Sequence, residues 1–228
     1  MLIGWRSSPR SARAPLSFEP AALELDKLFV DPDMFDSRKA WRRAGFDVFD
    51  PAKDTECMVA AHASAPGYLF KKYPDRIAQA VQRNNFAARA KGATRVAALI
   101  RDERLEHVVV PQKHIHVLSK RFGKDMQVLV VERIDIVGTD ASEQRYADIA
   151  EPVLRDLLRV LVKFPGLDSN SKNVQFTRDG KIAFIDLENY RRPDRKDVTL
   201  RSIRNYLSRE KFKLARTILG SRFREAPR

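Results

Sequence analysis

The sequence predicts a compact α+β fold in which a small β-rich part precedes a reduced helical part. Two observations support this prediction. Strand-like and helical runs follow one another between about residues 55 and 137, and an amphipathic helical stretch and a hairpin pattern occupy about 147–186. The chain has 228 residues, of which 43% are hydrophobic, so it is long enough to bury a core.

The β-rich part begins with two strand-like runs, at 56–59 and 67–73. The second run is rich in aromatic residues and ends in two lysines, Lys71 and Lys72, before a proline. Because side chains alternate along a strand, Lys71 should point to the same face as Leu69, and Lys72 to the opposite face.

Two helices are expected next, over about 75–90 and 93–105, with Gly92 between them. Strand-like runs at 107–118, interrupted by a proline, and at 126–131 follow. The chain therefore alternates between strands and helices before it enters a short link.

The link, residues 132–138, precedes a predicted amphipathic helix over about 147–163. Leucine, isoleucine and valine recur on one stripe of this helix, and Phe164-Pro165-Gly166 is the expected helix stop.

Three polar residues after this helix have a spacing that suits phosphoryl transfer. Asp168 precedes Asn173 by five residues, and Asp186 follows two short β-type runs joined by an Asp-Gly turn. A hairpin returns the chain to its starting point, so Asp186 should lie beside Asn173. Two oxygen ligands placed in this way suit Mg²⁺, which completes its shell with water and phosphate oxygens.

This segment resembles the catalytic loop and metal-binding motif of the protein-kinase-like superfamily, with Ile185-Asp186-Leu187-Glu188 where Asp-Phe-Gly usually stands. The order of elements from about residue 55 to 190 is similar to that of the family. The short chain after this motif resembles the small, atrophic bacterial effector kinases, so the resemblance implies a compact, minimal kinase-like fold. An ordinary hairpin with polar turn residues is the alternative explanation.

The resemblance implies a role for each matching residue. Asp168 would orient the acceptor hydroxyl, Asn173 and Asp186 would hold Mg²⁺, and Lys71 would contact the α- and β-phosphates of ATP, with Lys72 as the fallback.

The link 132–138 would correspond to the hinge whose backbone contacts adenine. Glu132 and Ile134 are the residues that we assign to this contact.

Several features depart from the family. A Gly-x-Gly-x-x-Gly motif is missing, and residues 61–67 are the only run near the lysine strand that could cover a phosphate. The helix after Lys71 has acidic residues only at its end, which leaves Glu103 as a weak partner for the lysine. Gly166 and Leu167 replace the usual His-Arg pair, and Asn170 stands where protein kinases carry a lysine that contacts the γ-phosphate.

The resemblance suggests a domain layout. Residues 1–20 are expected to be a flexible leader, and residues 21–228 a single domain. Within it, about 21–137 would be the small lobe and 138–228 a reduced second lobe with a basic tail.

Net charge is +13, and the tail contributes much of it, since residues 191–228 hold thirteen Lys or Arg against four Asp or Glu. We expect one or two amphipathic helices there with basic outer faces. This face either remains solvated or binds an acidic protein or an anionic lipid; nucleic acid is the less favoured ligand because a recognition motif is missing.

The single cysteine, Cys57, excludes a disulfide framework, and the sequence has no apolar run long enough for a membrane span.

The sequence therefore favours an ATP- and Mg²⁺-dependent phosphotransferase, with a protein Ser, Thr or Tyr hydroxyl as acceptor. An inactive pseudokinase or binding module, and a small-molecule or lipid kinase on the same core, are the alternatives. The expected location is the cytoplasm, or a host cell into which the protein is secreted as an effector.

Overall fold

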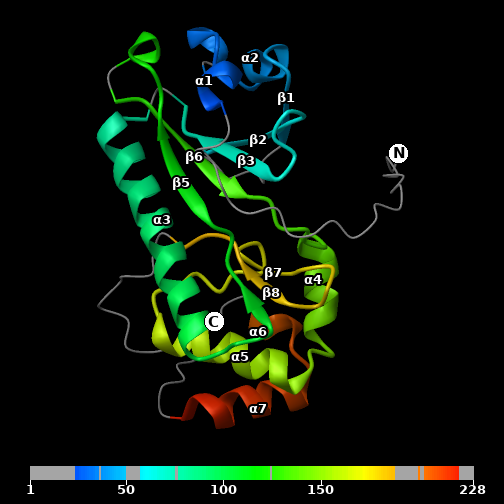
Figure 1. The fold of residues 1–228 in the computed structure, drawn as a ribbon. Helices are drawn as coiled ribbons and strands as arrows, with labels where there is room; N and C mark the ends of the chain where they lie inside the picture. Colours follow the sequence, from blue (N-terminus) through cyan, green and yellow to red (C-terminus); the bar gives the residue numbers. More distant parts are fainter. Residues whose placement is uncertain are drawn as a thin grey trace, which may run out of the picture.

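A computed structural model of the chain has an α+β fold (Figure 1). It describes residues 24–35, 37–49, 57–74, 77–123, 125–187, 200 and 203–220. The expected leader, residues 1–20, lies outside the described residues, as do residues 188–199.

A five-stranded antiparallel sheet forms the upper part of the molecule as drawn in Figure 1. Its strands are β1 (Phe46–Phe49), β2 (Met58–His62), β3 (Tyr68–Lys72), β5 (Lys113–Val117) and β6 (Gln127–Glu132). Their order is β1-β2-β3-β6-β5, so β6 lies between the lysine strand β3 and β5. The sequence predicted β3, which contains Lys71, and β6, which was expected over 126–131. It did not predict β1.

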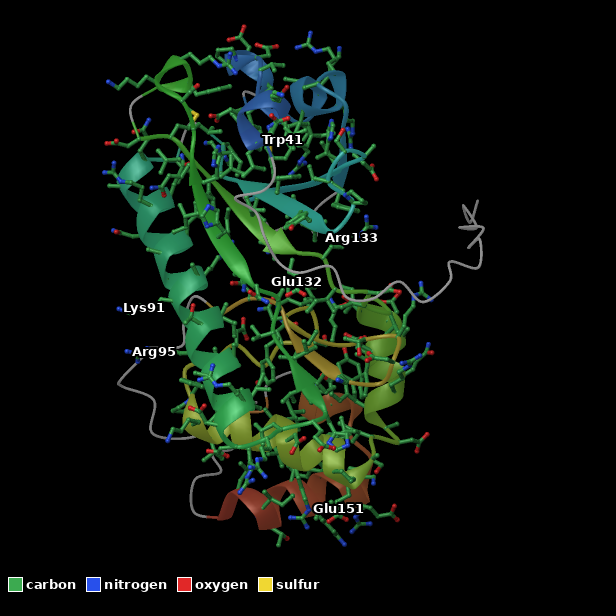
Figure 2. The ribbon with its side chains drawn as sticks, viewed as in Figure 1. Trp41, Lys91, Arg95, Glu132, Arg133 and Glu151 are labelled. Carbon is green, nitrogen blue, oxygen red and sulfur yellow. The ribbon has the colours of Figure 1, made fainter. Side chains whose placement is uncertain are left out.

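One face of this sheet is covered by the N-terminal segment. This segment consists of α1 (Leu25–Leu28), the 3-10 helix η2 (Pro32–Phe35) and α2 (Arg38–Arg43). Phe29 is fully buried, and its ring lies 5.7 Å from those of Phe35 and Phe46. Trp41 lies in the same cluster, above the sheet in Figure 2. Aromatic burial of this kind is the main source of stability on this face.

The opposite face packs against one long helix, α3 (Gln79–Asp102), and not against the two helices that the sequence predicted. Gly92 lies inside the helix and is buried. A glycine inside a helix costs about 1 kcal/mol relative to alanine. Here apolar contacts on both sides outweigh that cost, because Phe86 packs under the sheet and Val96 packs in the lower core.

The lower part contains a second, three-stranded sheet with helices around it. Its strands are β4 (Val108–Val109), β7 (Val174–Phe176) and β8 (Ile182–Phe184), in the order β4-β8-β7. The predicted strand 107–118 is thus divided between two sheets at Pro111: β4 runs parallel to β8, and β5 joins the upper sheet beside the short 3-10 helix η3 (Lys120–Phe122).

Two helices precede the polar loop where one was predicted. They are α4 (Thr139–Tyr146) and α5 (Glu151–Lys163). The predicted start at 147 was wrong because the chain turns between the helices, and Pro152 suits the first turn of α5, where a backbone donor is not needed. Every apolar residue of the predicted stripe that lies in α5 is buried.

The basic tail forms α6 (Ile203–Tyr206) and α7 (Arg209–Leu219). Ala215 and Leu219 pack in the lower core, while Lys213 and Arg216 are exposed. The expectation of an amphipathic helix with a basic outer face is confirmed for α7. None of the described helices combines the length and apolar character that crossing a bilayer requires.

Leu157 on α5 is fully buried in the lower core, so Leu157→Ala should reduce the free energy of unfolding by about 2–5 kcal/mol. Urea denaturation followed by circular dichroism would measure the change. Arg155 on the same helix has a half-exposed side chain, and Arg155→Ala should change stability by less than about 1 kcal/mol. Equal losses in the two variants would contradict the core assignment.

Candidate functional site

The loop after α5 is held in a compact turn that places Asp168 next to Asn173. The Asn170 carbonyl accepts from the Asn173 backbone N–H at 2.8 Å, and the Asn170 side chain accepts from the Lys172 N–H at 3.0 Å. The Asn173 side-chain amide then donates to Asp168 Oδ2 at 3.3 Å. This hydrogen bond directs the Asn173 nitrogen toward Asp168 and leaves its Oδ1 as an oxygen ligand on the other side.

The hairpin of β7 and β8 returns the chain to Asn173, as the sequence predicted. Val174 pairs with Phe184, and the Ile185 N–H donates to the Asn173 carbonyl at 2.8 Å. Asp186 is the next residue, so the register of the hairpin brings Asp168, Asn173 and Asp186 to one end of the small sheet.

Helix α4 supports this hairpin through side chains that sequence analysis did not single out. Tyr146 donates its hydroxyl to the Val174 carbonyl at 2.8 Å, and Ser142 accepts from the Phe176 N–H at 3.0 Å. Burial raises the pKa of the Tyr146 phenol, so it remains a neutral donor. Ser171 of the loop donates to Glu143 at 2.7 Å. Sequence analysis missed α4 because the run 139–146 is short and polar and lacks the apolar periodicity that predicts a helix.

Lys71 lies on the face of β3 that packs against α3, and Lys72 leaves the strand on the opposite face, as the predicted alternation requires. Lys71 pairs with Leu129 of β6, whose side chain lies in the cluster between the sheet and α3. Lys72 is buried at the end of the strand, where its Nζ lies 5.6 Å from the Phe35 ring centroid and donates to Gln82, in the first turn of α3, at 3.0 Å. Burial raises the pKa of Cys57 and lowers that of Lys113, two groups near Asp186, and the charge of Lys71 lowers both pKa values.

Arg89 of α3 connects the upper part to Asp186. Its Nη2 lies 3.1 Å from Asp186 Oδ2, and the side chain is only 9% exposed. The guanidinium also lies 5.7 Å from the centroid of the Tyr73 ring. Sequence analysis missed Arg89, because its position on a helix gave no sign that it would face a carboxylate nearly a hundred residues away.

Lys113, the first residue of β5, is a second cation that the sequence did not reveal. Its Nζ donates to the Ile185 carbonyl at 2.9 Å, next to Asp186. Desolvation by burial is the main cause that lowers its pKa to about 7, and Lys71 and Arg89 lower it further, while Asp186 acts in the opposite direction. The site therefore contains three basic residues near the carboxylate of Asp186. We call Lys71, Arg89 and Lys113 the cation trio.

The link between the two parts contains Glu132 and Ile134. The Glu132 N–H donates to the Gln112 carbonyl at 2.9 Å, and the Ile134 carbonyl accepts from the Ile136 N–H at 3.1 Å. Figure 2 shows Glu132 at the junction of the upper and lower parts. Each residue thus uses part of its backbone within the protein, and the assignment of adenine contacts to them stays a prediction.

Two weaker sequence assignments were wrong. The run 61–67 connects β2 to β3 at the Glu132 end of β3, and Gly67 accepts from the Arg133 N–H, so this loop lies at the opposite end of the strand from Lys71. Glu103 caps the far end of α3, where its carboxylate lies 3.7 Å from Arg159, so it is not a partner for Lys71.

The donors around Asn173 and Asp186 fit Mg²⁺ in chemical type, since both supply side-chain oxygens. One Asp186 oxygen is already engaged by Arg89. Within the described part of the chain, no cluster of three or more His, Cys, Asp or Glu side chains forms a self-sufficient metal cage. A metal here would therefore complete its coordination shell with water or with oxygens of a bound phosphate.

Comparison with known proteins does not assign the chain. No family model matches it, and no curated protein is significantly similar to it. The functional assignment consequently depends on the geometry of the site.

The lowered pKa of Lys113 predicts a pH-dependent stability difference. Between about pH 7 and pH 10.5 the unfolded chain binds a proton at Lys113 that the folded chain lacks, so the contribution of this residue to stability rises with pH. Lys113→Met should be more stable than the wild type near pH 7 by up to a few kcal/mol, and the gap should shrink toward pH 10.5. Urea unfolding at a series of pH values would measure it. A gap that does not vary with pH would contradict the prediction.

Proposed function

We propose that the protein is an ATP- and Mg²⁺-dependent phosphotransferase with a minimal kinase-like fold. The main support is the arrangement of Asp168, Asn173 and Asp186: a 3.3 Å hydrogen bond joins the first two, and the hairpin sets the third beside them. Loose phosphoryl-transfer transition states need positioning and charge neutralisation more than covalent chemistry, and such a set of groups can supply both.

The order of elements also supports the proposal. A lysine strand, a helix, three strands, a link, a helix, the polar loop, the hairpin and Asp186 follow one another. This is the order that the resemblance implies, except that α4 is an addition and one of the two expected strands is divided into β4 and β5. Lys71 and Asp186, more than a hundred residues apart, belong to one electrostatic group.

In this proposal each residue has a defined task. Asp168 accepts or orients the proton of the acceptor hydroxyl, and Lys71 contacts the α- and β-phosphates. Asn173 and Asp186 would hold Mg²⁺, which neutralises phosphate charge when bound.

The preferred acceptor is a protein hydroxyl, and a small molecule or lipid is the alternative acceptor. The exposed basic face of α7 would dock an acidic protein or an anionic lipid. Figure 1 shows α7 at the lower end of the molecule, beyond α5 as seen from the hairpin, so docking there would not block the site.

One observation favours a second candidate, a nucleotide-binding module without transfer activity. The ion pair with Arg89 occupies an oxygen of the carboxylate that the metal would need. A pseudokinase of this kind would bind ATP without a requirement for Mg²⁺.

Asp186→Ala and the isosteric Asp186→Asn should abolish the stabilisation that ATP provides in the presence of Mg²⁺. The reason is that each removes the negative oxygen ligand of the metal. A thermal-shift titration with ATP, with and without Mg²⁺, would measure this. Asp102→Ala, at an exposed carboxylate on α3, is the control and should behave as the wild type.

Stabilisation by ATP that does not need Mg²⁺ and survives both Asp186 substitutions would favour the binding module. The absence of any stabilisation of the wild type by ATP would overturn the nucleotide assignment altogether.

Asp168→Asn tests transfer itself. It retains the shape of the side chain and removes the base, so ATP turnover, including autophosphorylation, should fall by about 10²–10⁴-fold while ATP affinity changes little. Radiolabelled ATP would report both hydrolysis and phosphorylation. Unchanged turnover in Asp168→Asn would contradict the assigned role of Asp168.

A further inference from the structure

We propose that Arg89 and Lys113 bind the phosphate groups of the nucleotide together with Lys71, so that the cation trio forms a single polyphosphate site. The identification of the ligand as a nucleotide rests on the proposed function. Arg89 and Lys113 are additional binding residues, because the resemblance supplies only Lys71.

The three cations come from separate elements and lie near the end of the hairpin that contains Asp186. Lys71 pairs with Leu129 of β6, and Lys113 pairs with Val131 two residues further along the same strand. Directly paired residues project from the same face of a sheet, and residues two apart in a strand share a face. Both lysines therefore point toward α3, from which Arg89 approaches.

Contacts with the hairpin confirm this convergence. Arg89 lies 3.1 Å from Asp186 Oδ2, and the Lys113 ammonium lies 2.9 Å from the carbonyl of Ile185. Cys57, at the start of β2, is close to the same charges: burial raises the pKa of its thiol, and Lys71 and Arg89 both lower it.

A purely structural role explains these residues poorly. Lys71 and Arg89 are less than 10% exposed, and Lys113 is partly buried. Buried ion pairs seldom stabilise a fold more than apolar side chains of similar size would. Strongly perturbed charged groups gathered in one place are instead typical of functional sites.

The charges of the group favour an anion. The four side chains comprise three cations and one carboxylate, and the like charges of Lys71 and Arg89 help to lower the pKa of Lys113. A polyphosphate would offset this repulsion, because Coulomb attraction is strong where water is largely excluded. Anion binding would thus favour the protonated form of Lys113.

The donor types also match a polyphosphate. A guanidinium has five N–H donors in a planar fork that suits phosphate oxygens, and Arg89 places such a fork next to Asp186. The Tyr73 ring beside the guanidinium helps to maintain its orientation. The ammonium groups of Lys71 and Lys113 act as point charges on either side of β6.

The test measures binding of ATP, tripolyphosphate and adenosine to the full chain by isothermal titration calorimetry, with Mg²⁺ and salt held constant. The variants are Arg89→Met and Lys113→Met. Lys91→Met is the matched control, because Lys91 is exposed on the same helix and points away from the sheets in Figure 2.

Arg89→Met and Lys113→Met should each weaken ATP and tripolyphosphate binding by about tenfold to a hundredfold, since each removes a charged hydrogen-bond donor. Affinity for adenosine should change less than about twofold in either variant, and Lys91→Met should bind all three ligands as the wild type does. If Arg89→Met does not fold, Arg89→Lys replaces it, because lysine keeps the charge but lacks the planar fork. Arg89→Lys should also weaken ATP binding, and Lys113→Met remains the second test.

The outcomes separate this inference from the proposed function. Wild-type affinity for ATP in both variants would overturn the inference and leave the phosphotransferase proposal intact. Equal losses for ATP and adenosine would also overturn it, because the effect would not be specific to phosphate. Binding of tripolyphosphate but not ATP by the wild type, lost in both variants, would support the anion site and refute the nucleotide assignment. Binding of neither ligand by the wild type would refute both.

Discussion

The architecture depends on α3, which among the described helices is the one that packs in both parts of the molecule. Its 24 residues span about 36 Å. Phe86 near its start lies under the upper sheet, and Val96 and Leu99 near its end lie in the lower core with α5 (Figure 1). A continuous helix resists bending because each turn is hydrogen-bonded to the next. The upper sheet and the hairpin are consequently held in one relative position, with Arg89 between them.

The position of Arg89 determines the electrostatics of the site. The kinase-like fold that we propose would lead one to expect a glutamate on the helix after the lysine strand. Here α3 supplies a cation, and that cation contacts the carboxylate after the hairpin. The balance of charge around Asp186 is therefore shifted toward positive. If the site binds a nucleotide as proposed, the phosphates would supply the charge compensation that a lysine–glutamate pair would otherwise supply within the protein.

Helix α4, in the lower part of the molecule, also positions the site, because its side chains hydrogen-bond to the hairpin and to the polar loop. Tyr146 and Ser142 hydrogen-bond to the backbone of β7, and Glu143 accepts from Ser171. Two of these bonds join helix side chains to the short strand β7, and the third joins a helix side chain to the polar loop. Such bonds restrict the loop because a buried polar group left without a partner costs about 1–3 kcal/mol. Asp168 and Asn173 thus belong to a supported turn, although they lie outside any helix or strand.

Local sequence signals were sufficient where the structure is local. The Asp-Gly turn between two apolar runs predicted the hairpin, the leucine-rich stripe predicted α5, and alternation along β3 separated Lys71 from Lys72. The break predicted at Gly92 was wrong because packing at both ends of α3 outweighs the low helix propensity of one glycine. Helix α4 was missed because its polar, short sequence has little apolar periodicity.

By itself, the sequence determined the hairpin, α5, the opposite faces of Lys71 and Lys72 on β3, and the proximity of Asp168, Asn173 and Asp186, since these follow from short-range backbone geometry and one hairpin. Only the tertiary structure decided that Arg89 and Lys113 would lie beside Asp186. They come from a helix and a strand that are far from Asp186 in the chain, and their proximity arises from sheet pairing and helix packing. Neither process leaves a local pattern around the two residues, because charged side chains in a helix or at a strand end are usually solvated.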